Sequence, residues 1–254
     1  GVALGPILGG LVLSRSYSIG FVSAAVALIF FGLLIVFFLK ETLEIKRDDQ
    51  RENLLDQFKV LGQALKNKAF VRMLSSFTLM EICATLMWVI LAVYLKQNFG
   101  IDETLYSWIP TTNALMVIFL QVAITHRTNQ HEATKVMPIG AAFYPLAMLI
   151  VAYSSNYWGF LIAMVVMTFG ELITAPTATA YVANLAPPDQ RGRYLGFFGL
   201  NWFIALAIGP MGAGFLSDNI SIQAPWLAGA VVGVLSVLAF MSLKRLPKPV
   251  EEIV

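Results

Sequence analysis

Long apolar runs recur along the chain and predict membrane-spanning helices. Phe21–Leu39 and Pro225–Leu243 are each 19 residues long and hold no charged side chain. At a rise of about 1.5 Å per residue, a helix of that length matches a hydrocarbon core of roughly 30 Å. A helix also satisfies its own backbone polar groups in lipid. The pattern predicts an all-α integral membrane protein with one partial span, Val2–Leu13, and seven full spans: Gly20–Leu39, Met73–Leu95, Leu105–Thr125, Val136–Tyr153, Tyr157–Tyr181, Tyr194–Leu216 and Pro225–Leu243.

Lysine and arginine are distributed unequally between the two sides of these spans. The alternate loops on one side hold only Arg15 and Lys96. The other side holds the remaining basic residues: Lys40, Lys46, Arg47, Arg51, Lys59, Lys66, Lys68, Arg72, Arg127, Lys135, Arg191, Arg193, Lys244, Arg245 and Lys248. Because cytoplasmic loops carry the excess of Lys and Arg, this side and the C-terminus are expected to be cytoplasmic. The expected location is the plasma membrane, as a multi-pass protein of a bacterial inner membrane.

Composition agrees with a membrane protein and gives little reason to expect an enzyme. Hydrophobic residues make up 58% of the chain and charged residues 13%, about half the usual quarter in soluble domains. His126 and His131 lack the spacing of metal ligands, and no phosphate-binding glycine loop is found. The single cysteine, Cys83, excludes an internal disulfide. Neither a metal, a cofactor nor a nucleic acid is expected as a partner.

The longest loop divides the chain into a short first part and a longer second part. Residues 1–39 are interpreted as the end of one helical half, 40–72 as a cytoplasmic inter-domain loop, and 73–254 as a C-terminal six-helix bundle with its tail. Apolar residues at helical spacing between Leu54 and Leu65 suggest an amphipathic helix on the membrane surface within that loop.

A glycine-proline pair at the start of the chain is repeated near its end. Gly5-Pro6 precedes Gly9 and Gly10, and Gly209-Pro210 precedes further glycines about 200 residues later. Parallel repeats about an axis along the membrane normal are one known transporter plan. If the two spans are equivalent, each half holds six helices. The chain is then expected to begin in the fifth of twelve helices, with an N-terminal half as the missing partner.

The opening run then carries a family resemblance. The glycines and proline of G-x-x-x-G-P-x-x-G-G, here Gly1, Gly5, Pro6, Gly9 and Gly10, resemble the antiporter motif of drug:proton antiporters in the major facilitator superfamily. The segments FLKET and APPDQRGRYLGFFGL are similar to that family's inter-domain boundary and its tenth-to-eleventh helix connection. The loop THRTNQHEATK departs from the family's basic motif. The resemblance implies close helix packing by these residues and by Gly209 and Pro210.

Two glutamates lie near the middle of predicted spans, where a charge costs roughly 2.5–3.5 kcal/mol on insertion scales. Such residues are functional candidates by default, and Glu81 and Glu171 are therefore predicted to line a proton or substrate pathway. Polar and aromatic residues at helical spacing on the same spans are predicted to line it with them: Thr78, Thr85 and Trp88 beside Glu81, Thr174 and Tyr181 beside Glu171, and Asn113 and Gln121 on the span between, with Tyr106 and Trp202 as further aromatic candidates.

These features predict a proton-coupled secondary transporter that exports hydrophobic or cationic small molecules, of the multidrug efflux type. Its partners are then a small-molecule substrate, protons and the lipid bilayer. The segment around Glu171, GELITAP, resembles the tenth helix of superfamily exporters, and it also resembles that of proton-coupled peptide symporters. A symporter of peptides or other small solutes stays open, as does a non-transporting membrane protein on the same fold.

Overall fold

The computed structural model describes Gly5, Gly9, residues 16–38, Gly62 and residues 64–245. Within these ranges every regular element is helical, and seven helices are long and apolar enough to cross a membrane. The prediction of an all-α membrane protein with seven full spans is confirmed. The predicted partial span at 2–13 lies outside the described residues except for Gly5 and Gly9, and so does nearly all of the amphipathic segment between Leu54 and Leu65.

The described helices follow one another with short connections. The membrane-length units are α2 (Tyr17–Phe38), α4 (Lys68–Thr85) continued by the π-helical turn η1 (Leu86–Ile90) and α5 (Leu91–Phe99), α6 (Glu103–Tyr106) with α7 (Trp108–Thr128), α8 (Ala133–Tyr153), α9 (Tyr157–Leu185), α10 (Arg191–Asn219) and α11 (Ala224–Ser242). Two 3₁₀ turns complete the described elements. η2 (Pro188–Gln190) precedes α10, and η3 (Leu243–Arg245) follows α11.

Helix α4 extends a few residues beyond its apolar run because its first turn is capped. Asn67 accepts hydrogen bonds from the backbone N–H groups of Ala69 and Phe70 at 3.0 and 3.2 Å. This cap satisfies donors that the first helical turn leaves free. The span expected from Met73 therefore starts at Lys68, and Lys68–Arg72 belong to a helix that hydropathy alone placed in the loop.

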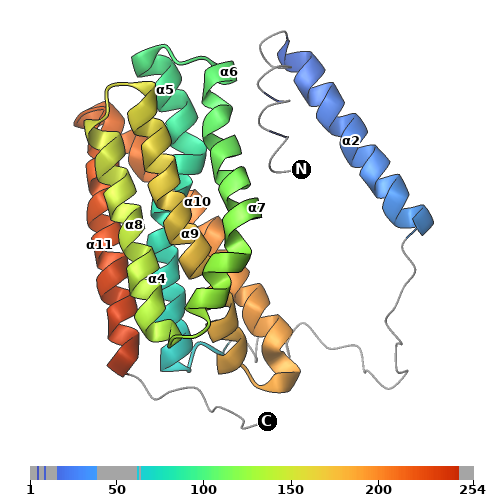
Figure 1. Cartoon of the computed structure of the whole chain (residues 1–254), viewed down its shortest axis with the longest axis vertical. Helices are drawn as coiled ribbons and strands as arrows, with labels where there is room; N and C mark the ends of the chain where they lie inside the picture. Colours follow the sequence, from blue (N-terminus) through green and yellow to red (C-terminus); the bar gives the residue numbers. More distant parts are fainter. Residues whose placement is uncertain (1–4, 6–8, 10–15, 39–61, 63, 246–254) are drawn as a thin grey trace.

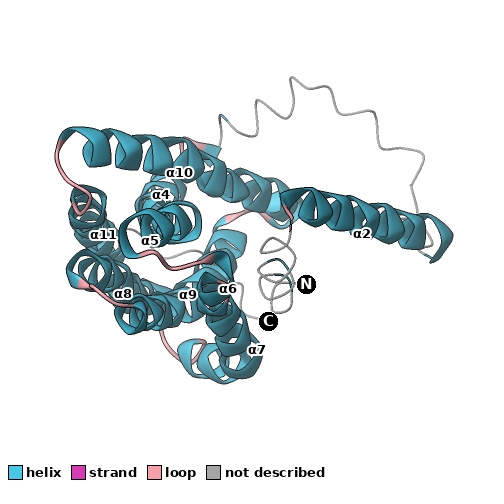
Figure 2. Ribbon diagram, turned by 90° about the horizontal axis from the view of Figure 1, so that it is seen from above, coloured by secondary structure: helices cyan, strands magenta, loops and turns pink. Residues whose placement is uncertain are grey.

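Six of the seven spans form one bundle, and α2 is drawn apart from it (Figure 1). Seen from above, α8 and α9 lie side by side, and α4 lies among α8, α9, α10 and α11 (Figure 2). The contacts of α7 are mainly with α9. The apolar side chains of α2 are exposed along its length, and so are Phe203, Met211 and Phe215 of α10. Such surfaces suit lipid or another helix rather than water.

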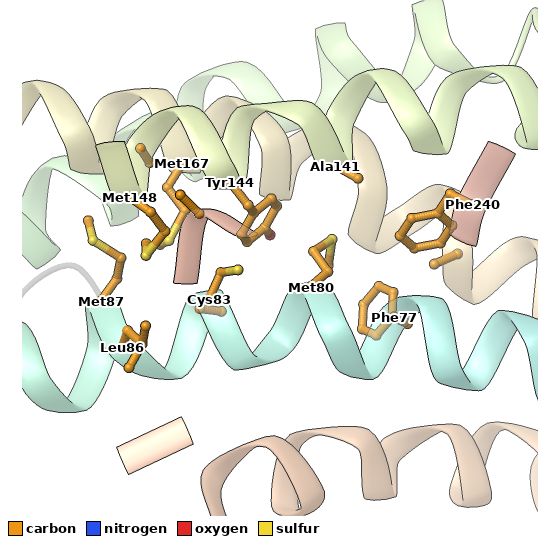
Figure 3. Packing of buried hydrophobic residues seen from close by; sticks show 14 of the residues in the cluster. Phe77, Met80, Cys83, Leu86, Met87, Ala141, Tyr144, Met148, Met167 and Phe240 are labelled. Carbon is orange, nitrogen blue, oxygen red and sulfur yellow. The ribbon is translucent and has the colours of Figure 1, made fainter. Parts of the chain in front are cut away.

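The bundle interior consists of methionines, aromatic rings and small residues. Tyr144 points from α8 toward the α4 side chains Met80 and Cys83 (Figure 3). Helices α8 and α9 are in close contact at Gly170. A Cβ at this position would lie only 2.7 Å from the Gly140 carbonyl oxygen. Glycine at this position lets the two backbones approach, as in small-residue packing between membrane helices.

Candidate transport cavity

A cavity of about 180 Å³ lies inside the bundle, between α4, η1, α8, α9 and α10. Two carboxyl groups, three aromatic rings, two methionines and two alanines surround it. The lining residues are Met80, Glu81, Ala84, Trp88, Tyr144, Met167, Glu171, Ala175 and Trp202. The predicted residues Glu81, Glu171 and Trp88 and the aromatic candidate Trp202 thus lie together, although they come from three different spans.

Helical spacing explains how α9 presents its part of the wall. Met167, Glu171 and Ala175 are four residues apart, so they lie one above another on a single face. Pro176 lies inside the same helix immediately after this face. A proline in a helix interior removes one backbone hydrogen bond and permits a kink.

An amide from α7 holds the Glu171 carboxyl group. Asn113 Nδ2 donates to Glu171 Oε2 at 2.7 Å and to Thr168 Oγ1 at 2.9 Å. Thr168 in turn donates to the carbonyl oxygen of Met164 at 2.8 Å. Asn113 is 3% exposed, so these bonds satisfy an amide that would otherwise be costly to bury.

The Glu81 carboxyl group has a different environment. Among the residues that the structure describes, no hydrogen-bond partner of Glu81 is found. It is close enough to Glu171 for their negative charges to repel each other. Within the described part of the chain, the residues that line the cavity include no lysine, arginine or histidine. A cavity with two acidic groups and no basic one attracts cations or protons.

The wall provided by α4 changes helix type beside the cavity. The backbone N–H of Leu91 donates to the carbonyl oxygen of Leu86, which is the i to i+5 pattern of a π-turn. Trp88 lies within this turn and lines the cavity. π-Turns inside α-helices are frequent at functional sites.

Comparison with known proteins identifies the family. Residues 73–253, most of the chain, match the model of the Major Facilitator Superfamily.

The chain belongs to the major facilitator superfamily.

Three superfamily relatives illustrate the similarity. The chain is 26% identical over 254 residues to the uncharacterized MFS-type transporter YttB of Bacillus subtilis, covering 99% of this chain and 63% of the relative. It is 28% identical to a Na(+), Li(+), K(+)/H(+) antiporter of Planococcus maritimus, covering 83% and 55%. It is 26% identical to the multidrug resistance protein MdtH of Aeromonas salmonicida, covering 72% and 46%. The chain thus spans roughly half the length of these relatives. Their names indicate transporters, and seven apolar helices make this chain a multi-pass membrane protein.

Two residues predicted to share the cavity face of α4 point elsewhere. Thr78 donates to Asn201 Oδ1 on α10 at 2.7 Å, and Thr85 is buried where Gly209 of α10 approaches. Neither threonine lines this cavity, and their place in a transport pathway stays a prediction. The cavity is centred on the side of Glu81 that carries Met80 and Ala84, so threonines on its other flank meet α10.

The other predicted pathway residues of this superfamily member lie around the cavity rather than in its wall. Thr174 is buried, donates to the Gly170 carbonyl oxygen at 2.6 Å and packs on Gly140. Tyr181 is 6% exposed in the apolar core. Gln121 donates to Thr125 Oγ1 at 2.8 Å and to the Leu172 carbonyl oxygen at 3.2 Å. These three side chains contact neighbouring helices or their own backbone and do not line this cavity, so their role in a transport pathway stays a prediction.

The predicted motif residues are only partly described. Gly209 lies where a Cβ would come within 2.3 Å of Thr85 Oγ1, and Pro210 follows it inside α10. No atom of the described residues outside the immediate backbone lies within 4 Å of a Cβ added at Gly5 or Gly9. Gly1, Pro6 and Gly10 lie outside the described residues. Close packing at the opening motif therefore stays a prediction.

Sequence reasoning missed most of the apolar cavity wall. Met80, Ala84, Tyr144, Met167 and Ala175 were not singled out because apolar residues are common in every span. Helical spacing carried a usable signal, since Ala84 and Trp88 follow Glu81 by three and seven residues, and Met167 and Ala175 flank Glu171 by four. The signal for Tyr144 was weaker, because the residues three, four and seven positions from it on α8 are all apolar or glycine.

Proposed function

We propose that this protein is a proton-coupled secondary transporter that exports hydrophobic or cationic small molecules. The pairing of Glu81 and Glu171 in one intramembrane cavity, without a basic residue in its wall, carries the proposal. A carboxyl group in such a place binds a proton or attracts a cation, and the two uses compete. Competition at one site couples the two ligands, and the coupling is reciprocal by linkage.

The rest of the cavity wall suits a lipophilic cation. Trp88, Trp202 and Tyr144 offer aromatic faces, which attract organic cations through cation–π interactions. Met80 and Met167 add flexible apolar surface that adapts to different shapes. The name of the MdtH relative, a multidrug resistance protein, supports the same substrate class.

We further propose that the six-span bundle from α4 to α11 is one half of the transporter, with the substrate path between it and an N-terminal half. Basic residues lie at the end of α7, in the turn η3 after α11 and at the starts of α4, α8 and α10, and these all lie at one end of the bundle (Figure 1). The positive-inside rule supports placing this end, and the C-terminus, in the cytoplasm of a bacterium.

A second candidate function is exchange of alkali metal ions for protons. It is supported by the relative named as a Na(+), Li(+), K(+)/H(+) antiporter. The same carboxyl pair would serve it, but the three aromatic rings would then have no part in recognition. The two functions are separated by the cation that is moved.

The test uses membrane vesicles that contain the full gene product carrying these 254 residues. Efflux of a lipophilic cationic dye driven by a pH gradient is compared for the parent, Glu81→Gln, Glu171→Gln and the control Glu132→Gln. Glu132 pairs with Lys135 at an exposed position, where ion pairs contribute little. We expect Glu81→Gln and Glu171→Gln to lower coupled efflux by at least about tenfold and the control to leave it unchanged.

Other outcomes point to the alternatives. Exchange of Na⁺ or K⁺ for protons without dye efflux favours the second candidate. Proton-driven uptake of a solute favours a symporter. Parent-like efflux from both cavity variants would contradict the carboxyl mechanism.

A further inference from the structure

The two carboxyl groups of the cavity differ in their hydrogen bonding. Glu171 accepts a bond of 2.7 Å from Asn113 Nδ2. Glu81 has no such donor among the described residues. An amide N–H is a donor that an ionised carboxylate accepts well, and hydrogen bonding to the charged form favours it.

Asn113 is itself held in place. Its Nδ2 also donates to Thr168 Oγ1 at 2.9 Å, and Thr168 is tied to the backbone of α9 through Met164. Both acceptors of the amide nitrogen therefore come from α9, three residues apart on the same helix. This geometry aims Asn113 at one oxygen of Glu171.

Both carboxyl groups line one small cavity, where two like charges repel each other and a bound proton or cation relieves the repulsion. Among the residues that the structure describes, the other titratable groups within electrostatic range are the Tyr144 phenol on α8 and the Cys83 thiol on α4. Neither type of group carries a charge at neutral pH in its ordinary state. On the α10 side the cavity wall is Trp202. The shared proton is therefore expected on the carboxyl group that lacks the amide donor.

We infer that Asn113 is a positioning residue that keeps Glu171 as the fixed, charged acceptor and leaves Glu81 as the carboxyl group that exchanges its proton for the cationic ligand. When the cation enters, Glu81 releases its proton to water. When a proton returns to Glu81, the cation leaves. This assignment rests on the proposed function and gives the two carboxyl groups of that site different roles.

The experiment follows proton release on ligand binding. The full gene product in detergent and weak buffer is titrated with tetraphenylphosphonium, and the released protons are followed with a pH indicator. We expect Glu81→Gln to bind the probe with little or no proton release. We expect Glu171→Gln to bind it more weakly and still release protons as the parent does.

Variants of the amide test its positioning role. Removing the donor in Asn113→Leu frees Glu171, so the double variant Glu81→Gln/Asn113→Leu should regain proton release that Glu81→Gln lacks. A purely structural role of Asn113 predicts no such recovery. Thr168→Val removes the acceptor that helps to aim Asn113, so Glu81→Gln/Thr168→Val should recover proton release in the same direction as Glu81→Gln/Asn113→Leu but by less. Glu132→Gln, at an exposed ion pair, serves as the control and should behave like the parent.

A measurement without ligand covers the case in which Asn113→Leu does not fold. The infrared band of a protonated carboxyl group is expected in the parent and in Glu171→Gln, and is expected to be absent from Glu81→Gln. Loss of proton release in Glu171→Gln with retention in Glu81→Gln would overturn the inference alone, as would an equal reduction in both. No probe binding by the parent would overturn the proposed function and the inference with it.

Discussion

Glycines bring helices close together on both sides of the cavity, but they meet different partners. At the α8–α9 contact, a Cβ on Gly170 would meet the backbone carbonyl of Gly140 at 2.7 Å. At the α4–α10 contact, a Cβ on Gly209 would meet the Thr85 hydroxyl at 2.3 Å, and the nearest backbone atom lies 3.5 Å away. A backbone cannot yield without moving its helix, whereas a hydroxyl can rotate.

The difference assigns unequal roles to the two walls. The wall that carries Glu171 belongs to a pair of helices locked backbone to backbone, and Asn113 holds its carboxyl group. The wall that carries Glu81 is held by side chains and contains a π-turn. We therefore expect conformational change during transport to occur mainly at α4–α10, with α8–α9 moving as a unit.

The largest expected effect comes from locking the α4–α10 contact. An added Cβ at Gly209 lies 3.5 Å from the Thr85 Cβ, within the usual disulfide range. In Thr85→Cys/Gly209→Cys, we expect oxidation to abolish dye efflux and reduction to restore it. Efflux is measured before and after oxidation. Undiminished efflux from a fully cross-linked sample would mean that this contact does not move.

A smaller but clear effect is expected at the locked contact. Gly170→Ala places a methyl group against a backbone oxygen, against Tyr144 and against Phe143. Overpacking of this kind costs about 1–3 kcal/mol, and we expect a lower unfolding temperature. Thermal unfolding in detergent, followed with a thiol-reactive dye at the buried Cys83, measures it. A parent-like transition would show that α8 and α9 separate more easily than we infer.

Gly209→Ala should cost less, because its contact is a side-chain oxygen. We expect a loss of about 1 kcal/mol, most of which the double variant Gly209→Ala/Thr85→Ala should recover because the clashing hydroxyl is gone. The same thermal assay on the two single variants and the double variant gives the coupling. Additive losses would place the strain elsewhere.

The smallest effect is expected at Gly212, where no atom lies within 4 Å of an added Cβ. Gly212→Ala lowers the conformational entropy that the chain loses when this helix position is ordered, which stabilises the fold by roughly 0.5–1 kcal/mol. We expect unchanged or slightly higher thermal stability and unchanged efflux. A loss of efflux with intact folding would indicate that another helix packs on this side of α10.

Hydropathy was sufficient to predict the spans and to single out the two glutamates that line the cavity, because the free energy of inserting apolar and charged residues depends mainly on local sequence. It was insufficient to predict that Thr78 and Thr85 contact α10. The side of α4 that packs on α10 depends on contacts between segments about 120 residues apart. The Asn113–Glu171 bond likewise joins two spans. Helical spacing within one span shows which residues share a face, but it does not show that Asn113 of another span bonds Glu171.

The π-turn was also beyond local reasoning. Leu86–Ile90 contains neither proline nor glycine, so no residue in it interrupts an α-helical pattern. Its place is defined by neighbours instead: Gly209 approaches Thr85, and Gly229 of α11 approaches Leu86, where a Cβ would lie 2.8 Å from Cδ1. The π-turn therefore lies where neighbouring helices pack closely, and the sequence of Leu86–Ile90 alone does not predict it.

The same turn has a consequence for how this span compares with others over evolutionary time. A π-turn accommodates one residue more than the α-helix on either side of it. Deleting one residue from Leu86–Ile90 would therefore let an ordinary α-helix continue while the residues beyond it keep the direction they face now. Tyr94 would stay on its aromatic neighbours Trp226 and Phe160. A relative lacking the turn should therefore align with a single-residue gap here and keep aromatic partners at these positions, whereas loss of the turn without a deletion would rotate Tyr94 away from them by roughly 100°.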